Sequence, residues 1–239
     1  STTSSVRSRS VEIDIEAYPP LASCPGNDQF DGTTLDASRW SVVRRDDQFL
    51  SVDGGTLNLN AQPGEDIHGG NSDTQRNIVL QDLPDSGPWT ATTRVTWNPT
   101  VNFQNAGLLI YTDDNNWIKT GMVWNGSRTF EAFKELNDTP SGLGSSAAGA
   151  GFPTTFYVRF TSDGTTVRAQ RSADGETWTN TGNATNLSGL TNPKIGMYAT
   201  ASTHGLLRLV AVLSTRHPIV TIALLGPSWP RRSTGGRGS

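Results

Sequence analysis

The chain has 239 residues, of which 34% are hydrophobic, 8% aromatic and 17% charged. This apolar content is enough for a sizeable core and excludes disorder over the whole length. The net charge of −3 gives no reason to expect nucleic acid as a partner, and a single cysteine, Cys24, excludes an internal disulfide framework. Together, 25 glycines and 13 prolines favour short strands joined by turns over long helices.

The first segment, residues 1–27, is predicted to be a linker or the end of an upstream domain, because it mixes Ser, Thr, Arg and Pro around one short alternating run. On a strand, Glu12, Asp14 and Glu16 of this run project from one face. Such a row of carboxylates can supply the nucleophile and the general acid of retaining glycoside hydrolysis. An exposed edge strand has the same pattern, so both interpretations stay open.

From residue 28 to about residue 203 the pattern becomes regular, with short β-branched or aromatic runs that end at Gly, Asp, Asn or Pro. About eleven strands at this spacing predict an all-β fold, a two-sheet antiparallel sandwich or a barrel. The expected strands are 40–44, 48–52, 56–60, 77–82, 89–97, 105–112, 116–124, 128–135, 155–161, 165–171 and 194–200.

Alternation indicates which strands are covered on one face and which on both. Phe156, Val158 and Phe160 share one face of their strand, which is typical of a half-buried strand. Residues 106–111 are apolar on both faces, as expected for a central strand. The Gly/Ala/Ser stretch 143–151 has no period, and we expect it to be a mobile loop.

Several segments, in this order, resemble the concanavalin A-like β-sandwich at the C-terminus of family 43 glycoside hydrolases of the β-xylosidase type. The resemblance covers roughly residues 28–203 and implies a jelly-roll-like two-sheet sandwich that recognises polysaccharide, usually beside a catalytic domain. Its segments are Asp28 to Gly32 with Leu35, Asp36 and Trp40, Asn77 to Gln81, Trp89 with Thr90, Asn102 to Tyr111, Asn115 to Lys119, Arg171 to Trp178 and Ile195 to Ala199.

Two departures from that family limit what carries over. The chain has no five-bladed propeller, so the catalytic carboxylates of those hydrolases have no counterpart positions here. The chain also runs into an atypical basic tail, 206–239, which contains five arginines and no acidic residue and whose end we expect to be non-native or disordered. The apolar stretch of the tail is interrupted by Arg208, Arg216 and Pro218, so no membrane span is expected. The run Glu12 to Glu16 resembles the signature of family 16 glycoside hydrolases, which keeps an enzyme as an alternative.

Aromatic residues near the strand 116–124 suggest a carbohydrate site. A sugar ring needs a flat aromatic platform flanked by hydrogen-bonding side chains. We expect Trp117 to be the platform and Trp124 to assist it, with polar neighbours on nearby strands; core packing of these rings is the competing interpretation. The expected polar neighbours are Gln104, Lys119, Arg128 and Glu131.

Acidic residues near the start of the sandwich offer candidate metal ligands. Asp28 and Asp31 carry the carboxylate oxygens that Ca²⁺ accepts, and turn formation explains the same residues without a metal. No other cofactor is expected to be required, since the histidines lack zinc-site spacing and no nucleophile elbow, P-loop or dinucleotide fingerprint occurs.

The sequence therefore predicts a secreted, extracellular, non-catalytic carbohydrate-recognition module, spanning 28–205, of a bacterial glycan-degrading protein. The expected partner is a polysaccharide or oligosaccharide, with no nucleic acid and no membrane, and the chain is expected to be a monomer or part of a larger multidomain chain. The alternatives are a glycoside hydrolase that uses Glu12 and Glu16, and a structural spacer without a sugar site.

Overall fold

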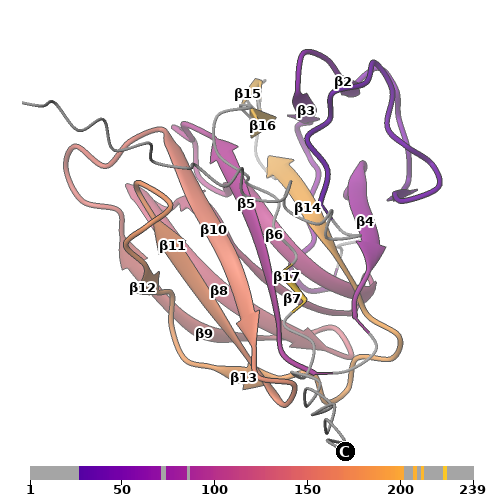
Figure 1. Ribbon diagram of the computed structural model, residues 1–239. Helices are drawn as coiled ribbons and strands as arrows, with labels where there is room; N and C mark the ends of the chain where they lie inside the picture. The colour runs from indigo at the N-terminus through magenta and orange to yellow at the C-terminus, as the bar shows by residue number, and fades with distance from the viewer. Residues whose placement is uncertain are drawn as a thin grey trace, which may run out of the picture.

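The computed structural model describes residues 27–70, 74–84 and 87–201, and the backbone of three short strands at 207–208, 211–212 and 223–224. Throughout this part of the chain the regular elements are β-strands, and the described residues include no apolar helix that could span a bilayer. The all-β prediction is confirmed, and two layers of strands are visible in Figure 1.

The larger layer is a seven-stranded antiparallel sheet with the order β1-β4-β14-β6-β7-β8-β9. Its centre is formed by β14, β6 and β7, where one side of the sheet packs on the second layer and the other side is covered by the loop before β4. The strands are β1 (Ser41–Val43), β4 (Ile78–Asp82), β6 (Gln104–Asp113), β7 (Asn116–Trp124), β8 (Arg128–Leu136), β9 (Thr139–Ala147) and β14 (Lys194–Ala201).

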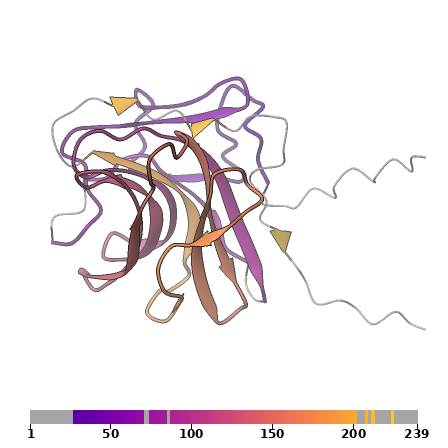
Figure 2. The same ribbon diagram turned by 90° about the vertical axis from the view of Figure 1, so that its left-hand side faces the viewer.

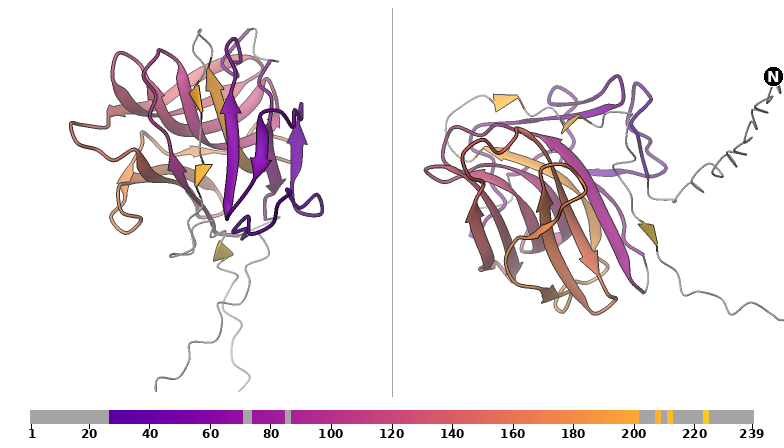
Figure 3. Two further views of the ribbon diagram at one scale, coloured as in Figure 1. Left: turned by 90° about the horizontal axis from the view of Figure 1, so that it is seen from above. Right: turned by 60° about the vertical axis from the view of Figure 1, so that its left-hand side comes forward.

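The second layer is a six-stranded sheet with the order β12-β11-β10-β5-β17, in which β13 also pairs with β11. Figures 2 and 3 show this layer stacked against the larger sheet from three further directions. Its strands are β5 (Trp89–Thr96), β10 (Thr155–Ser162), β11 (Thr166–Ser172), β12 (Thr179–Asn180), β13 (Thr185–Asn186) and β17 (Ala223–Leu224).

A smaller group of strands lies around β3, which pairs with β2, β15 and β16. The bounds are β2 (Leu50–Val52), β3 (Thr56–Ala61), β15 (Leu207–Arg208) and β16 (Ala211–Val212). Thus three short strands from the basic tail pair with the sandwich, two with β3 and one with β5.

The main core lies between the two layers and follows the predicted alternation. Phe156, Val158 and Phe160 on β10 are fully buried, and the intervening residues of β10 are partly exposed. Residues 104–111 of β6 are buried on both faces, as predicted for a central strand. At the centre of the larger sheet Gly107 pairs with Gly121, and a Cβ on Gly107 would lie 2.1 Å from the carbonyl oxygen of Thr120. Only glycine lets these two strands approach so closely.

The expectation of a mobile loop at 143–151 is wrong for most of that stretch. Residues up to Ala147 belong to β9, the edge strand of the larger sheet, which pairs with β8 from Thr129↔Ala147 to Leu136↔Thr139. An edge strand can pair through main-chain hydrogen bonds alone, whatever its side chains are. The side chains of β9 are mostly small, so its sequence shows no alternation of apolar and polar residues from which a strand could be predicted.

Candidate functional site

A pocket of about 300 Å³ opens on the outer face of the seven-stranded sheet, the face turned away from the second layer. Odd-numbered residues of β6, β7 and β8 project from this face, because the register places Asn105 opposite Val123 and Lys119 opposite Phe133. The Gly107 and Gly121 pair leaves the middle of the face without side chains. The pocket is lined by, among others, Asp66, His68, Phe103, Lys119, Glu131 and Phe133.

Lys119 is the buried cation of this pocket. Its side chain is 5% exposed, and its Nζ lies 3.1 Å from Oε1 of Glu131. The ammonium also lies 5.7 Å, 5.8 Å and 5.9 Å from the ring centroids of Trp117, Phe133 and Tyr198. An aromatic surround and one carboxylate hold the charge away from bulk water, so the ammonium is fixed in position before any ligand arrives.

Glu131 is oriented by a hydrogen-bond chain that runs across three strands. The amide Nδ2 of Asn105 donates to Oε1 of Glu131 at 2.6 Å, and the hydroxyl of Tyr198 donates to Oδ1 of Asn105 at 2.8 Å. Burial raises the pKa of Tyr198 well above its ordinary value, so the phenol keeps the proton that it donates. The chain therefore presents a fixed carboxylate beside a fixed ammonium.

Aromatic side chains form the rim of the pocket. Phe103 is 52% exposed, whereas the other large hydrophobic residues of the described chain are buried or partly buried. The His68 ring meets the Phe133 ring edge-on, with centroids 5.1 Å apart. Partial burial, and then the nearby charge of Lys119, lower the pKa of His68, so its imidazole is neutral at pH 7.

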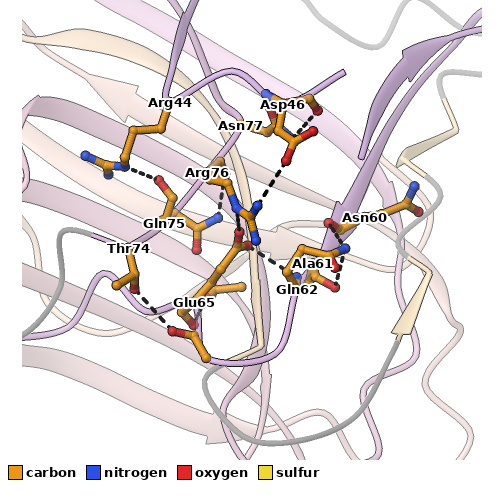
Figure 4. Close-up of polar contacts among 12 residues, drawn as sticks. Arg44, Asp46, Asn60, Ala61, Gln62, Glu65, Thr74, Gln75, Arg76 and Asn77 are labelled. Atoms are coloured by element: carbon orange, nitrogen blue, oxygen red, sulfur yellow. Dashed lines mark hydrogen bonds and ion pairs between the residues drawn. The ribbon is translucent and has the colours of Figure 1, made fainter. Parts of the chain in front are cut away.

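The loop that carries Asp66 and His68 is anchored on both sides of the pocket. Its buried Glu65 accepts from Nε of Arg76 at 2.6 Å, and Nη1 of the same arginine donates to Asp46 at 2.9 Å (Figure 4). At the other end the Gly69 amide donates to the buried carboxylate of Glu135 at 2.9 Å. Burial raises the pKa of Glu65 and of Glu135. Because the loop is anchored at both ends, His68 has a defined place in the rim.

The six residues predicted to bind carbohydrate do not share one face. The structure brings Lys119 and Glu131 together in the pocket, with Trp117 beneath them on the same face. The expectation that Trp117 offers a ring to solvent is wrong, because its side chain is fully buried and its Nε1 donates to the carbonyl of Asp114 at 3.1 Å. The indole supports Lys119 from below and cannot stack on a ligand.

The other three predicted residues lie on the opposite face, as their even numbers on β6, β7 and β8 require. Gln104 is fully buried, and its Oε1 accepts from the amides of Thr100 and Val101. Arg128 donates to the carbonyls of Phe152 and Pro153. These hydrogen bonds hold loops, so they give Gln104 and Arg128 structural roles, and Trp124 is half-buried beside them.

Four residues of the pocket were not predicted as site residues from the sequence: Phe103, Phe133, His68 and Asn105. Phe103 adopts a left-handed backbone conformation, with φ of 67°, in the turn before β6. A phenylalanine at positive φ is rare, and no sequence period reveals it. Phe133 and Asn105 could have been predicted, because they are odd-numbered residues of β8 and β6 and therefore lie on the same face of the sheet as Lys119 and Glu131.

Asp28, one of the two residues proposed for a structural calcium ion, has hydrogen-bond partners within the chain. Oδ2 of Asp28 accepts from the indole Nε1 of Trp40 at 2.6 Å, and Oδ1 accepts from the amide of Phe30 at 2.7 Å. Asp31 stands exposed, and the described residues contain no group of three or more His, Cys, Asp or Glu side chains placed to hold a metal ion. Asp28 is thus a clamp for the buried Trp40.

The alternative catalytic residues Glu12, Asp14 and Glu16 lie outside the described residues. On the outer face of the sheet, Glu131 and Glu135 belong to one strand, four residues apart. Each of these carboxylates has its own partners within the chain: Glu131 accepts from Asn105 and pairs with Lys119, and Glu135 accepts from the Gly69 amide.

Two stacked antiparallel sheets with a jelly-roll-like strand order define a concanavalin A-like β-sandwich. The sequence model of the family described as the beta xylosidase C-terminal concanavalin A-like domain matches residues 27–206. The chain belongs to this family. A comparison with curated protein sequences returned no match.

Solved structures with the same fold come from larger and smaller proteins. The GH43 protein BlXynB mutant (K247S) from Bacillus licheniformis matches with 20% identity and a TM-score of 0.69, over 78% of this chain and 37% of that chain. Xylan beta-1,4-xylosidase from Bacillus halodurans C-125 matches with 16% identity and a TM-score of 0.68, over 81% and 39%. A functionally unknown protein from Saccharomyces cerevisiae matches with 18% identity and a TM-score of 0.59, over 72% and 92%. The chain spans well under half of the two Bacillus proteins.

Proposed function

We propose that the chain is a non-catalytic carbohydrate-recognition module of a secreted bacterial glycan-degrading protein, and that the pocket on the outer face of the larger sheet binds the sugar. The observation that carries this proposal is the combination of a fixed ion pair, Lys119 with Glu131, and the exposed ring of Phe103 at one pocket. Sugars present hydroxyl groups and apolar C–H faces together, and this pocket offers partners for both.

The size of the pocket supports recognition of a small part of a glycan. At about 300 Å³ it lies at the lower end of the range of small-molecule sites. Glu131 is held by Lys119 and Asn105, which suits a hydrogen-bond acceptor for hydroxyl groups better than a nucleophile. The xylosidase named above is a protein that acts on xylan, so neutral plant polysaccharides are the first ligands to test.

The proposal extends the predicted organisation of the chain. In this proposal residues 28–205 are the body of the module, residues 1–27 are a linker or the end of an upstream domain, and 206–239 are a compositionally different tail whose short strands pair with β3 and β5. A glycoside hydrolase that uses Glu12 and Glu16 stays a prediction of the sequence. A spacer without a sugar site is the second candidate function, and the burial of Trp117 favours it because one expected platform is lost.

Isothermal titration with neutral and acidic oligosaccharides tests the proposal. We expect Phe103→Ala to weaken binding of a neutral oligosaccharide roughly two- to tenfold, because a stacked ring contributes about 0.5–1.5 kcal/mol. The exposed position of Phe103 keeps the fold intact. Trp124→Ala is the matched control, since this aromatic residue lies on the opposite face of β7. Equal loss in both variants, or no binding by the wild type, would refute the pocket as a sugar site.

A further inference from the structure

A second hollow lies beside the pocket, over the edge of the larger sheet. It measures about 200 Å³ and is bordered by Thr129 on β8 and by Gly142, Gly144 and Ser145 on β9. We call it the edge hollow. The pocket and the edge hollow share three lining residues, Asn125, Glu131 and Phe133, so the two spaces adjoin along the Phe133 side of the pocket.

Together the two spaces cross the sheet from strand to strand. The pocket reaches Thr200 on β14, and the edge hollow reaches Ser145 on β9. The strands between them follow in the order β14-β6-β7-β8-β9, which makes four spacings of about 4.8 Å, or about 19 Å in total. This length suits a row of linked rings, whereas a single sugar would use the pocket alone.

We infer that the pocket and the edge hollow are consecutive subsites for one linear, neutral oligosaccharide that runs across the strands, with Phe133 between the two subsites. The inference rests on the proposed function and adds to it the direction, the length and the charge class of the ligand. Phe133 suits this place because it lines both spaces and is only partly buried.

The charges along this path select against acidic sugars. Lys119, the cation of the pocket, is already paired with Glu131, and Asp66 adds a second carboxylate to the rim. His68 is neutral at pH 7, because partial burial and the Lys119 charge lower its pKa. The residues that line the edge hollow include no basic side chain. A uronic acid would therefore meet uncompensated negative charge, whereas hydroxyl groups find amide, carboxylate and hydroxyl partners.

Small residues on β9 keep the edge hollow open. A Cβ on Gly142 would lie 3.6 Å from Cε1 of Phe133, so a larger side chain there would cover the edge of the ring. Gly144 packs against Gly182, where a Cβ would approach Cα to 2.5 Å, and substitution there would disturb the backbone. Thr129 and Ser145 are the two positions at which the edge hollow can be filled with little effect on packing, because neither is buried.

The double variant Thr129→Leu/Ser145→Leu tests the inference, with Ser141→Leu as the matched control. Ser141 is an exposed residue of β9 that pairs with Lys134 and lines neither space. The probes are xylose, xylotetraose, glucose, cellotetraose and trigalacturonic acid, measured by isothermal titration against the full chain. For at least one of the two neutral pairs, xylose with xylotetraose or glucose with cellotetraose, we expect the tetrasaccharide to bind the wild type roughly tenfold more tightly than the monosaccharide. This ratio corresponds to about 1.4 kcal/mol from contacts in the second subsite.

The double variant should lose that tenfold advantage and keep its affinity for the monosaccharide, and Ser141→Leu should retain both. Trigalacturonic acid should bind the wild type more weakly than the neutral tetrasaccharide. If the wild type binds monosaccharide and tetrasaccharide equally, if the double variant keeps the advantage, or if the acidic trisaccharide binds best, the inference is wrong and the proposed function stands. No binding of any probe by the wild type would refute the proposed function and the inference together.

Discussion

The buried ion pair of the pocket gives an asymmetric prediction about stability. Two unit charges 3.1 Å apart, the separation of Lys119 Nζ and Glu131 Oε1, attract by ~5 kcal/mol at an effective dielectric constant of about 20. Most of this attraction offsets the desolvation of the two groups, so removing one partner exposes the cost of the group that stays. The side chain of Lys119 is 5% exposed and that of Glu131 is 15% exposed. Leaving the Lys119 ammonium without its partner should therefore lower the free energy of unfolding more than leaving the Glu131 carboxylate without its partner.

Glu131→Ala should destabilise the protein by about 3–4 kcal/mol, because it strands a buried ammonium and also removes the acceptor of the Asn105 amide. Lys119→Met should cost about 1 kcal/mol or less. The methionine fills the same space among three aromatic rings, and Glu131 keeps its hydrogen bond from Asn105.

Urea denaturation followed by tryptophan fluorescence measures both free energies of unfolding, with circular dichroism as the control for a native fold. The double variant Glu131→Ala/Lys119→Met should be more stable than Glu131→Ala alone, because it no longer contains the stranded charge. The reasoning is refuted if Lys119→Met destabilises as much as Glu131→Ala, or if the double variant recovers nothing.

Three further predictions concern groups around the site. Gly121→Ala should destabilise by about 3 kcal/mol in urea titration, because the new Cβ would lie 2.1 Å from the carbonyl oxygen of Ala106; a change below about 0.5 kcal/mol would contradict the close approach of β6 and β7. Asp28→Ala should cost about 1–3 kcal/mol by leaving the buried indole N–H of Trp40 unpaired, whereas EDTA should not shift the melting temperature of the wild type; a calcium-dependent shift would overturn the assignment of Asp28 as a clamp. Burial raises the pKa of Glu135 in the folded state, so the stability of the wild type falls as pH rises through that pKa. The free energy of unfolding of Glu135→Gln should therefore rise relative to that of the wild type between pH 4 and pH 7. The same difference between the two proteins at both pH values would contradict this prediction.

Strand periodicity made most of the fold predictable. The runs around Trp89, Ala106, Trp117 and Phe156 lie in strands of the structure close to the expected bounds, because each alternates or is continuously apolar. The strand β9 escaped prediction because residues such as Gly142, Ser145 and Ala147 carry no hydrophobic signal. Its pairing with β8 arises from main-chain groups, which every residue other than proline provides in full.

The site was less predictable than the fold. Side chains alternate between the two faces along a strand, and this alternation correctly places Lys119 and Glu131 on one face of the sheet. The same alternation places Trp124 and Arg128 on the opposite face. Whether Trp117 is exposed depends on the loop before β4, which packs Ile67 and His68 over the sheet. That contact joins segments about fifty residues apart, so no local pattern could reveal it. Phe103 depends on a left-handed backbone turn that the sequence does not signal.

The central claim is that the outer face of the larger sheet is where a neutral glycan binds. Amide chemical-shift mapping by NMR during titration with a neutral tetrasaccharide that binds tests it most directly. The largest shifts should fall on Asn105, Lys119, Val123, Glu131 and Ser145, which line the pocket or the edge hollow. Shifts confined to β5, β10 and β11 of the second layer would contradict the account.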